Sequence, residues 1–361
     1  MSGLNPYAEM SASRFWRTAI AERDFLDLDD LWSPAYDISP EDKVVTAGSC
    51  FAQHIGRALA RNGYGWTDFE PAPPLLDPEA AKAFNYGIFS FRTGNIYTTQ
   101  QLLQWLRWAR NKEPAPEEVW EKDGRFFDPF RPQIEPGGFA SADEMFAARD
   151  NTLRAFNRAF RQADIFVFTL GLTEMWVDAE TGLSYPTCPG TIAGTFDPDR
   201  HKFKNLTYPE IYKQLKTVIR IASNINPTMK FLLTVSPVPL TATAADKHVL
   251  VSTTYSKSVL RAVAGDLAEE YDHVDYFPSY EIISSAPSQA RFYEPNMRSV
   301  HPDGVSFVMS QFFRGLGVAQ RDPVEMTTLP NDEQLRARLV QSRDEDDLVC
   351  EEQVLEAYNA N

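Results

Sequence analysis

Residues 43–62, KVVTAGSCFAQHIGRALARN, pass directly from a strand pattern to a helix pattern. Residues 43–47 form a short β-branched run, and residues 50–62 carry apolar side chains at helical spacing, with Gly63 following as a C-cap. The tight turn of small residues between them ends at Ser49. The stretch therefore predicts a strand, a turn and a helix, with Ser49 at the carboxyl end of the strand.

Strand and helix patterns alternate along the rest of the chain. We expect further strands over residues 165–170 (IFVFTL), 230–235 (KFLLTV) and 274–277 (VDYF). Helical patterns occupy residues 98–111, 142–162, 208–224 and 252–271. Because connections of this length join parallel strands, the sequence predicts an α/β fold, a mostly parallel sheet with helices on both faces.

Composition divides the chain into three parts. Residues 1–40 are aromatic and acidic, and we expect them to form an arm that packs on the core. Residues 41–325 form the predicted α/β domain, with insertions near 112–143, which is rich in proline and glycine, and near 177–207, which is rich in loops. Residues 326–361 are strongly acidic, and we expect a solvated helix or tail there.

The charge balance limits the kind of partner. Lys and Arg together number 35 and Asp and Glu number 50, which gives a formal net charge of −15. An acidic chain without a basic cluster is unsuited to nucleic acid or to an anionic membrane surface. We therefore expect a small-molecule substrate, no nucleic acid and no membrane insertion, while the oligomeric state stays open.

The three cysteines, Cys50, Cys188 and Cys350, are an odd and sparse set. They predict neither a disulfide framework nor a zinc site, and we expect no bound metal. The N-terminal residues lack the pattern of a secretory signal, and no run of 18 apolar residues occurs. The sequence therefore favours a soluble protein of the reducing cytoplasm.

Ser49 is the first candidate for chemistry. Ligands of parallel sheets collect outside the carboxyl ends of the strands. A serine before a helix is often only an N-cap, because its oxygen accepts a main-chain N–H. The same position places a hydroxyl beside free N–H groups that stabilise a developing anion, which suits a nucleophile. Both interpretations are open at this point.

Residues 48–52 read GSCFA, and the chain resembles the GSCFA family, a group of bacterial proteins similar to SGNH/GDSL hydrolases. The resemblance extends over roughly residues 13–320. Further blocks that carry it are 85–88 (NYGI), 170–176 (LGLTEMW), 236–239 (SPVP), 255–257 (YSK), 275–281 (DYFPSYE) and 301–302 (HP). The resemblance implies a flavodoxin-like three-layer α/β/α sandwich and acyl-ester chemistry, often on carbohydrate.

The resemblance also assigns roles. Ser49 would be the nucleophile and His301 the base. The backbone N–H of Ser49 or Cys50, the backbone N–H of Gly87 and the hydroxyl of Thr173 would form the oxyanion hole. A Cys50 thiolate at the start of a helix is the alternative nucleophile.

Two positions depart from the family pattern that the resemblance brings. Thr173 stands where SGNH proteins carry an asparagine, and Arg298 stands three residues before His301, in the place of an aspartate. A histidine base still needs an acceptor on its other nitrogen. The candidates are Asn296, Asp303, Asp275, Glu294 or a main-chain carbonyl. Possible substrate contacts are Asn85, Glu174, His248, Arg298, Asn95 and Arg92.

These residues favour a two-step acyl transfer through a serine ester. With water as the acceptor the protein is an esterase acting on an O-acylated carbohydrate or polysaccharide, and it needs no cofactor. With a sugar hydroxyl as the acceptor it is an O-acyltransferase that uses a donor such as acetyl-CoA. A non-catalytic carbohydrate-binding protein is the third possibility, because fold alone does not confer activity.

Overall fold

The computed structural model describes residues 5–318 and 348–359. Its central sheet has the strand order β1-β4-β8-β9, and all neighbouring strands run parallel. The strands are β1 (Val44–Gly48), β4 (Ile165–Leu170), β8 (Lys230–Val235) and β9 (Val274–Tyr276). Nearly every residue in them is buried, which explains why they read as continuous apolar runs. The predicted α/β class is confirmed.

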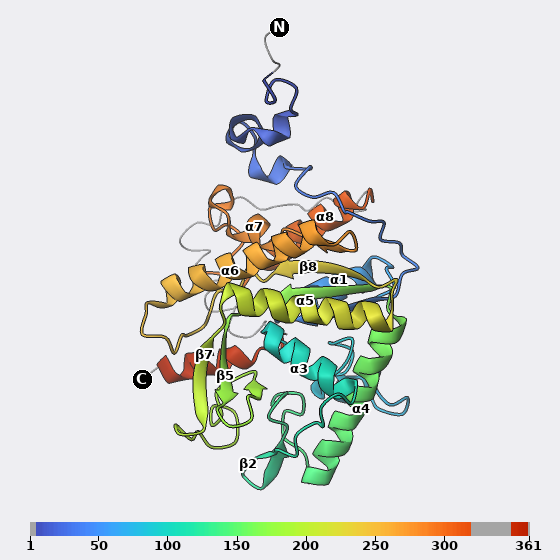
Figure 1. Ribbon diagram of the computed structural model, residues 1–361, viewed down its shortest axis with the longest axis vertical. Coiled ribbons are helices and arrows are strands. Elements are labelled where there is room, and N and C mark those ends of the chain that lie inside the picture. Colours follow the sequence, from blue (N-terminus) through green and yellow to red (C-terminus); the bar gives the residue numbers. More distant parts are fainter. Residues whose placement is uncertain (1–4, 319–347, 360–361) are drawn as a thin grey trace.

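Helices cover both faces of this sheet (Figure 1). One layer contains α3 (Thr99–Ala109), α4 (Ala142–Gln162), α5 (Tyr208–Ile225) and α6 (Val249–Glu270). The other contains α1 (Phe51–Arg61), α7 (Ser279–Ser284) and α8 (Pro302–Gly315), and the short α2 (Pro78–Ala83) lies outside both layers. Alternate strand side chains serve the two layers, so Val45 and Phe166 pack in one core and Val44 and Ile165 in the other.

Helix starts follow capping rules that the sequence carries. Thr98 and Gln101 form a reciprocal capping box at α3, and Thr207 with Glu210 does the same at α5. Helix α6 begins at Val249, about one turn before the predicted start, because the His248 side chain accepts the Leu250 N–H and caps it there.

In the described residues, no helix combines the length and apolar character needed to cross a bilayer.

Two small antiparallel sheets lie outside the central one. Strands β5 (Glu174–Asp178), β6 (Ser184–Tyr185) and β7 (His201–Asn205) pair in the order β6-β5-β7, and β2 (Trp120–Lys122) pairs with β3 (Arg125–Phe127). The expectation of a loop-rich stretch over 177–207 was therefore incomplete. These strands are short and partly polar, so they lack the alternating pattern by which a strand is predicted.

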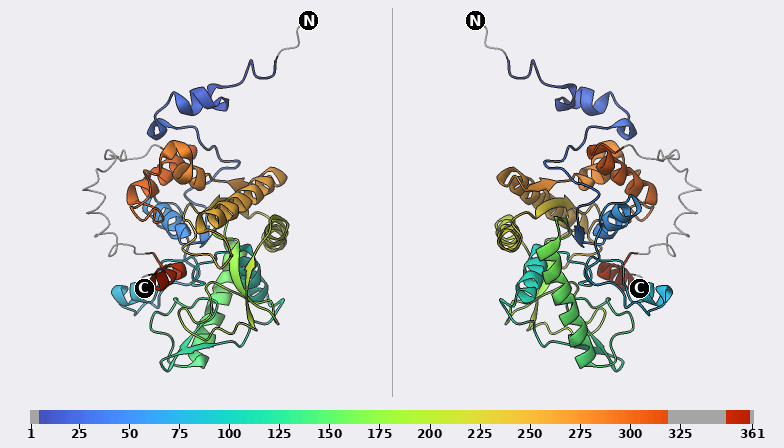
Figure 2. Two further views of the ribbon diagram at one scale, coloured as in Figure 1. Left: turned by 90° about the vertical axis from the view of Figure 1, so that its left-hand side faces the viewer. Right: turned by 90° about the vertical axis from the view of Figure 1, so that its right-hand side faces the viewer.

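The N-terminal arm has two parts. It contains the short helices η1 (Ala12–Arg14), η2 (Arg17–Ala21) and η3 (Phe25–Asp27). Residues 5–24 are mostly exposed and project away from the body (Figure 2), whereas residues 25–40 pack on α8 and β9. Trp32 stacks on Phe312 with ring centroids 5.3 Å apart, and the Ala35 N–H donates to the Asp275 carboxylate. The second part of the arm thus completes one of the two cores.

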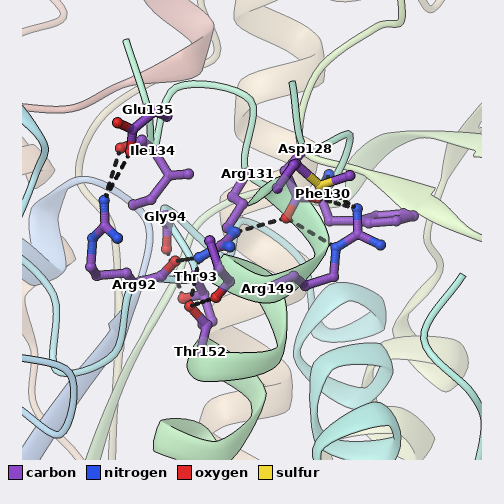
Figure 3. A network of polar contacts seen from close by, with 12 residues as sticks. Arg92, Thr93, Gly94, Asp128, Phe130, Arg131, Ile134, Glu135, Arg149 and Thr152 are labelled. Carbon is purple, nitrogen blue, oxygen red and sulfur yellow. Dashed lines mark hydrogen bonds and ion pairs between the residues drawn. The ribbon is translucent and has the colours of Figure 1, made fainter. Parts of the chain in front are cut away.

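A buried ion cluster ties the 112–143 insertion to α4 (Figure 3). The Asp128 carboxylate contacts Arg131 and Arg149 at 2.7 Å each, and all three side chains are almost fully buried. Burial alone would raise the pKa of Asp128, but the two guanidinium groups hold it below its usual value. Arg131 also donates to the Arg92 main-chain oxygen. The cluster therefore fixes the segment that leads to the carboxyl edge of the sheet.

His54 on α1 gives the fold a pH dependence. Burial, followed by the charges of Arg57 and Arg61, lowers the pKa of His54 from 6.5 to about 4. Because the unfolded chain binds a proton here and the folded chain does not, stability falls as the pH drops below 6.5. Between pH 7 and pH 5 this single group is expected to cost about 2 kcal/mol.

Urea unfolding of wild type and His54→Gln at both pH values checks this expectation. The variant has no such group, so its loss of unfolding free energy over the same interval should be smaller by about 2 kcal/mol. Equal losses in the two proteins would contradict the assignment.

Candidate functional site

The turn after β1 is built on a glycine that no other residue can replace. Gly48 has φ +130°, and a Cβ there would lie 2.2 Å from the Thr169 oxygen on β4. The Ser49 N–H donates to that same oxygen at 3.0 Å, while the main-chain oxygen of Ser49 accepts the Ala52 N–H at 2.8 Å. The chain thus turns from strand to helix within two residues and leaves Ser49 at the carboxyl edge of the sheet.

The Ser49 hydroxyl is buried and makes no hydrogen bond within the described residues. The residue is 3% exposed, and its Oγ has no hydrogen-bond partner in the described part of the chain. It is not an N-cap, because Cys50 holds that position and no side-chain cap bond is made. The Thr173 hydroxyl is likewise buried without a partner, although its N–H donates to Ser256. Unpaired buried hydroxyls are costly, so two of them at this edge call for a functional explanation.

Ser49, Gly171 and Tyr97 lie side by side at this edge. A Cβ on Gly171 would come within 3.0 Å of the Ser49 Cβ and 3.1 Å of the main-chain oxygen of Tyr97. That oxygen accepts the N–H groups of Gly171 and Leu172 at 3.3 and 2.9 Å. The glycine of the 170–176 block is therefore needed to let the backbone approach the serine.

The structure does not bring Gly87 and Asn85 to the serine, which corrects two sequence-based assignments. Gly87 is exposed with open space around it, and the Asn85 amide donates to the oxygens of Gln133 and Ile134. The segment after Gly87 contacts the middle of β1 at Ser90 and reaches the carboxyl end at Ile96, whose N–H donates to the Gly48 oxygen. The residue at that end is therefore a different asparagine, ten positions later.

Asn95 occupies this position. It is 2% exposed, follows Gly94 with φ +68°, and hydrogen-bonds the Tyr97 hydroxyl. The sequence contained a signal for it, since 93–95 (TGN) is a second turn containing glycine and asparagine. Asn95 was expected only as a possible substrate contact. Arg92, the other such candidate in this segment, points instead to the Phe84 oxygen and Glu135.

Glu174 lines a cavity beyond the end of β4, and Ser49 is not among the lining residues. The Glu174 carboxylate accepts the Thr243 hydroxyl at 2.8 Å, and burial raises its pKa. The cavity has a volume of about 320 Å³. Other residues that line this cavity are Leu172, Met175, Trp176, Tyr185, Phe203 and Leu240. The cavity is large enough for a small ligand and is mostly apolar.

His301 caps α8. Its Nδ1 accepts the Asp303 N–H at 3.1 Å and lies 3.4 Å from the Asp303 carboxylate, and its Nε2 lies 3.9 Å from Glu294. Neither ring nitrogen hydrogen-bonds Ser49, whose hydroxyl has no partner in residues 5–318 and 348–359. Two of the expected orienting carboxylates are thus beside the imidazole, but the serine and histidine do not touch.

The remaining predicted contacts serve local structure. Asn296 is exposed and accepts the N–H groups of Arg298 and Ser299 within its own turn. Asp275 is held by the Ala35 and Tyr276 N–H groups. His248, expected as a possible substrate contact, is exposed and caps α6. The capping hydrogen bond explains why a histidine lies at position 248. Its location therefore gives no evidence that it binds a substrate.

The C-terminal segment, which we define as residues 348–359, is the main feature that the sequence did not predict. It contains the helix η5 (Glu351–Asn359) and lies against the carboxyl edge of the sheet. Glu351 is 1% exposed, and its carboxylate accepts Asn95 and Tyr97 at 2.7 Å each. The Val349 oxygen accepts Gln53 and Asn95. A solvated tail is therefore wrong for these residues, while the proposed boundary at 325–326 lies outside the described residues.

Charged groups surround this contact. Lys257 is buried and donates to the Gly171 oxygen at 2.8 Å, and burial lowers its pKa to about 8. Arg298 reaches Glu352 of the C-terminal segment at 3.4 Å, and burial raises the pKa of that carboxyl to about 7. Arg298 thus contacts the C-terminal segment, although it was expected to contact a substrate.

In the described residues, no group of acidic, histidine or cysteine side chains is arranged to hold a metal ion.

Fold and site together define an α/β protein whose first strand presents a buried serine at the start of a helix. The chain belongs to the GSCFA family, whose model matches residues 43–312. Membership of this family suggests a hydrolase-like enzyme. Comparison with curated proteins and with solved structures gives no match to this chain.

Proposed function

We propose that the protein is a serine acyl-ester hydrolase with Ser49 as its nucleophile. The observation that carries this proposal is the buried Ser49 hydroxyl at the carboxyl edge of the sheet, which has no hydrogen-bond partner among the residues that the structure describes. A hydroxyl at a helix start adjoins main-chain N–H groups that stabilise negative charge. An N-cap serine would instead use its oxygen on the helix, and Ser49 does not.

The acylation step uses groups of this edge. Ser49 Oγ attacks the ester carbonyl carbon while the His301 Nε2 takes its proton, which then passes to the leaving alcohol. In the capping position Nδ1 accepts the Asp303 N–H; once the imidazole has turned, the Asp303 carboxylate, now 3.4 Å away, would accept the Nδ1 proton. Reaching Ser49 requires the imidazole to turn away from its capping position at α8.

The oxyanion would be held by three donors. The Ser49 N–H is already used on Thr169, so the Cys50 N–H is the main-chain donor. The unpaired Thr173 hydroxyl is the second, and the Asn95 amide takes the place that the resemblance gave to Gly87. We propose an O-acylated carbohydrate as the substrate, because the aromatic side chains of Trp176, Tyr185 and Phe203 line the same cavity as the Glu174 carboxylate.

Acyl transfer to a sugar hydroxyl is the second candidate, and the burial of Ser49 favours it. A site closed to bulk water protects an acyl-enzyme from hydrolysis, so another acceptor can compete. Acetyl-CoA would be the donor in that case.

A donor and acceptor assay tests both functions. The reduced full-length protein is incubated with p-nitrophenyl acetate, and separately with acetyl-CoA with and without an acetyl-free oligosaccharide. We expect release of p-nitrophenol without any acceptor. Consumption of acetyl-CoA only with the oligosaccharide would favour the transferase. Wild type that is inert towards every donor, and that fails to react with a fluorophosphonate at Ser49, would overturn both.

A further inference from the structure

Two cysteines from opposite ends of the chain meet beside Ser49. Cys50 lies at the start of α1, Cys350 lies in the C-terminal segment, and each is 5% exposed. Both line a cavity of about 20 Å³ together with Arg298 and His54. A space of this size admits a molecule close to water in size. The third cysteine, Cys188, is half-buried and lines the separate large cavity.

The surroundings make the two thiols chemically unequal. The neighbouring Cys50 thiol and the Arg298 guanidinium, whose Nη2 is 4.0 Å from Sγ, lower the pKa of Cys350 to about 5. The Tyr97 hydroxyl oxygen lies 3.7 Å from this sulfur. The Cys350 thiol and burial raise the pKa of Cys50. Cys350 is therefore the thiolate and Cys50 the proton-bearing partner.

We propose that Cys50 and Cys350 form a reversible disulfide on exposure to a peroxide, and that this bond locks the C-terminal segment over Ser49. Both thiols face the same cavity of about 20 Å³, which is where the S–S bond would form. The segment is otherwise held by the hydrogen bonds of Val349, Glu351 and Glu352. A disulfide next to Ser49 would hold the C-terminal segment in place until a thiol reductant breaks the S–S bond.

The chemistry balances with hydrogen peroxide as the oxidant. The Cys350 thiolate attacks one peroxide oxygen, the O–O bond breaks, and Cys350 becomes a sulfenic acid with release of hydroxide. Cys50 then attacks the sulfenic sulfur, the S–S bond forms, and water leaves with the Cys50 proton. The hydroxide takes up the proton that Cys350 had lost. In total, two thiols lose two electrons and two protons, and one peroxide becomes two waters.

Peptide mapping of the oxidised protein tests the pair. The reduced full-length protein is treated with equimolar hydrogen peroxide, its remaining thiols are alkylated, and digests with and without reductant are compared by mass spectrometry. We expect one cross-linked peptide joining Cys50 to Cys350, with Cys188 alkylated. Cys188→Ser should form the same cross-link and Cys350→Ser none. A stable sulfenic acid on Cys350 without a cross-link, or a bond that includes Cys188, would overturn the proposal.

The effect on activity rests on the proposed function, and it is measured separately. If Ser49 is the nucleophile, peroxide should lower turnover of p-nitrophenyl acetate by wild type and Cys188→Ser about 100-fold or more. A thiol reductant should restore it, and Cys350→Ser should resist the peroxide. A cross-link in a protein that turns over no ester in either redox state would sink the hydrolase proposal and leave the disulfide standing. Turnover that is unaffected by a formed cross-link would overturn the lock over the serine.

Discussion

Ser49→Ala is expected to lower the turnover of p-nitrophenyl acetate by about three orders of magnitude or more. The reason is that no covalent ester can form without the hydroxyl, and only the oxyanion donors and substrate binding remain. The rate is measured on reduced protein at saturating substrate, so that loss of binding is separated from loss of chemistry. A variant that keeps a tenth or more of the wild-type rate would contradict the role of Ser49, and loss of turnover in Cys50→Ala alone would point to the thiol.

The same substitution should leave the fold intact or stabilise it slightly. The Ser49 Oγ has no hydrogen-bond partner in the described residues, so its removal costs no bond and relieves an unpaired buried hydroxyl. Ser252→Ala on α6 is the matched control, because its hydroxyl is also buried and unpaired. Both variants should unfold at or above the wild-type urea midpoint, while only Ser49→Ala loses turnover.

Asp128→Ala is expected to lower the free energy of unfolding by about 3–5 kcal/mol. The substitution removes the only carboxylate that contacts the guanidinium groups of both Arg131 and Arg149 in the described residues, and it leaves two buried positive charges side by side. Urea unfolding at neutral pH measures the loss. Because Arg131 also holds the Arg92 oxygen, the segment that positions Asn95 should loosen as well.

Asp150→Ala provides the control for charge removal. Asp150 follows Arg149 on α4 but is exposed, so its replacement should change stability by no more than about 0.5 kcal/mol. Equal effects of the two substitutions would show that the buried cluster contributes no more than a surface charge does.

The sheet and most helices could be predicted because their signals are local. The runs at β4 and β8 are apolar over their full length, and the predicted bounds of 165–170 and 230–235 match the structure. Helix α4 likewise agrees with its prediction, because Ser141 caps its start. The strand, turn and helix around Ser49 follow from residues 43–62 alone.

The candidate site was harder to predict because it depends on how distant segments meet. Gly87 and Asn95 both sit in turns with glycine and asparagine, and only the path of residues 90–96 along β1 decides which reaches the carboxyl edge. The C-terminal segment was missed because its acidic composition indicates solvent exposure. Glu351 is buried because Asn95 and Tyr97 donate hydrogen bonds to its carboxylate, and Glu352 is buried against Arg298.

If the Asn95 amide holds the oxyanion as we propose, Glu351 is a competitor of the substrate for that amide. Any substrate that binds the Asn95 amide must first displace the Glu351 carboxylate. Because Glu351 belongs to the same chain, diluting the protein does not lower its concentration at the site. The measured affinity then equals the intrinsic affinity reduced by the fraction of molecules in which the carboxylate is away. Variants that weaken Glu351 should therefore bind substrate more tightly without any change in the atoms that contact it.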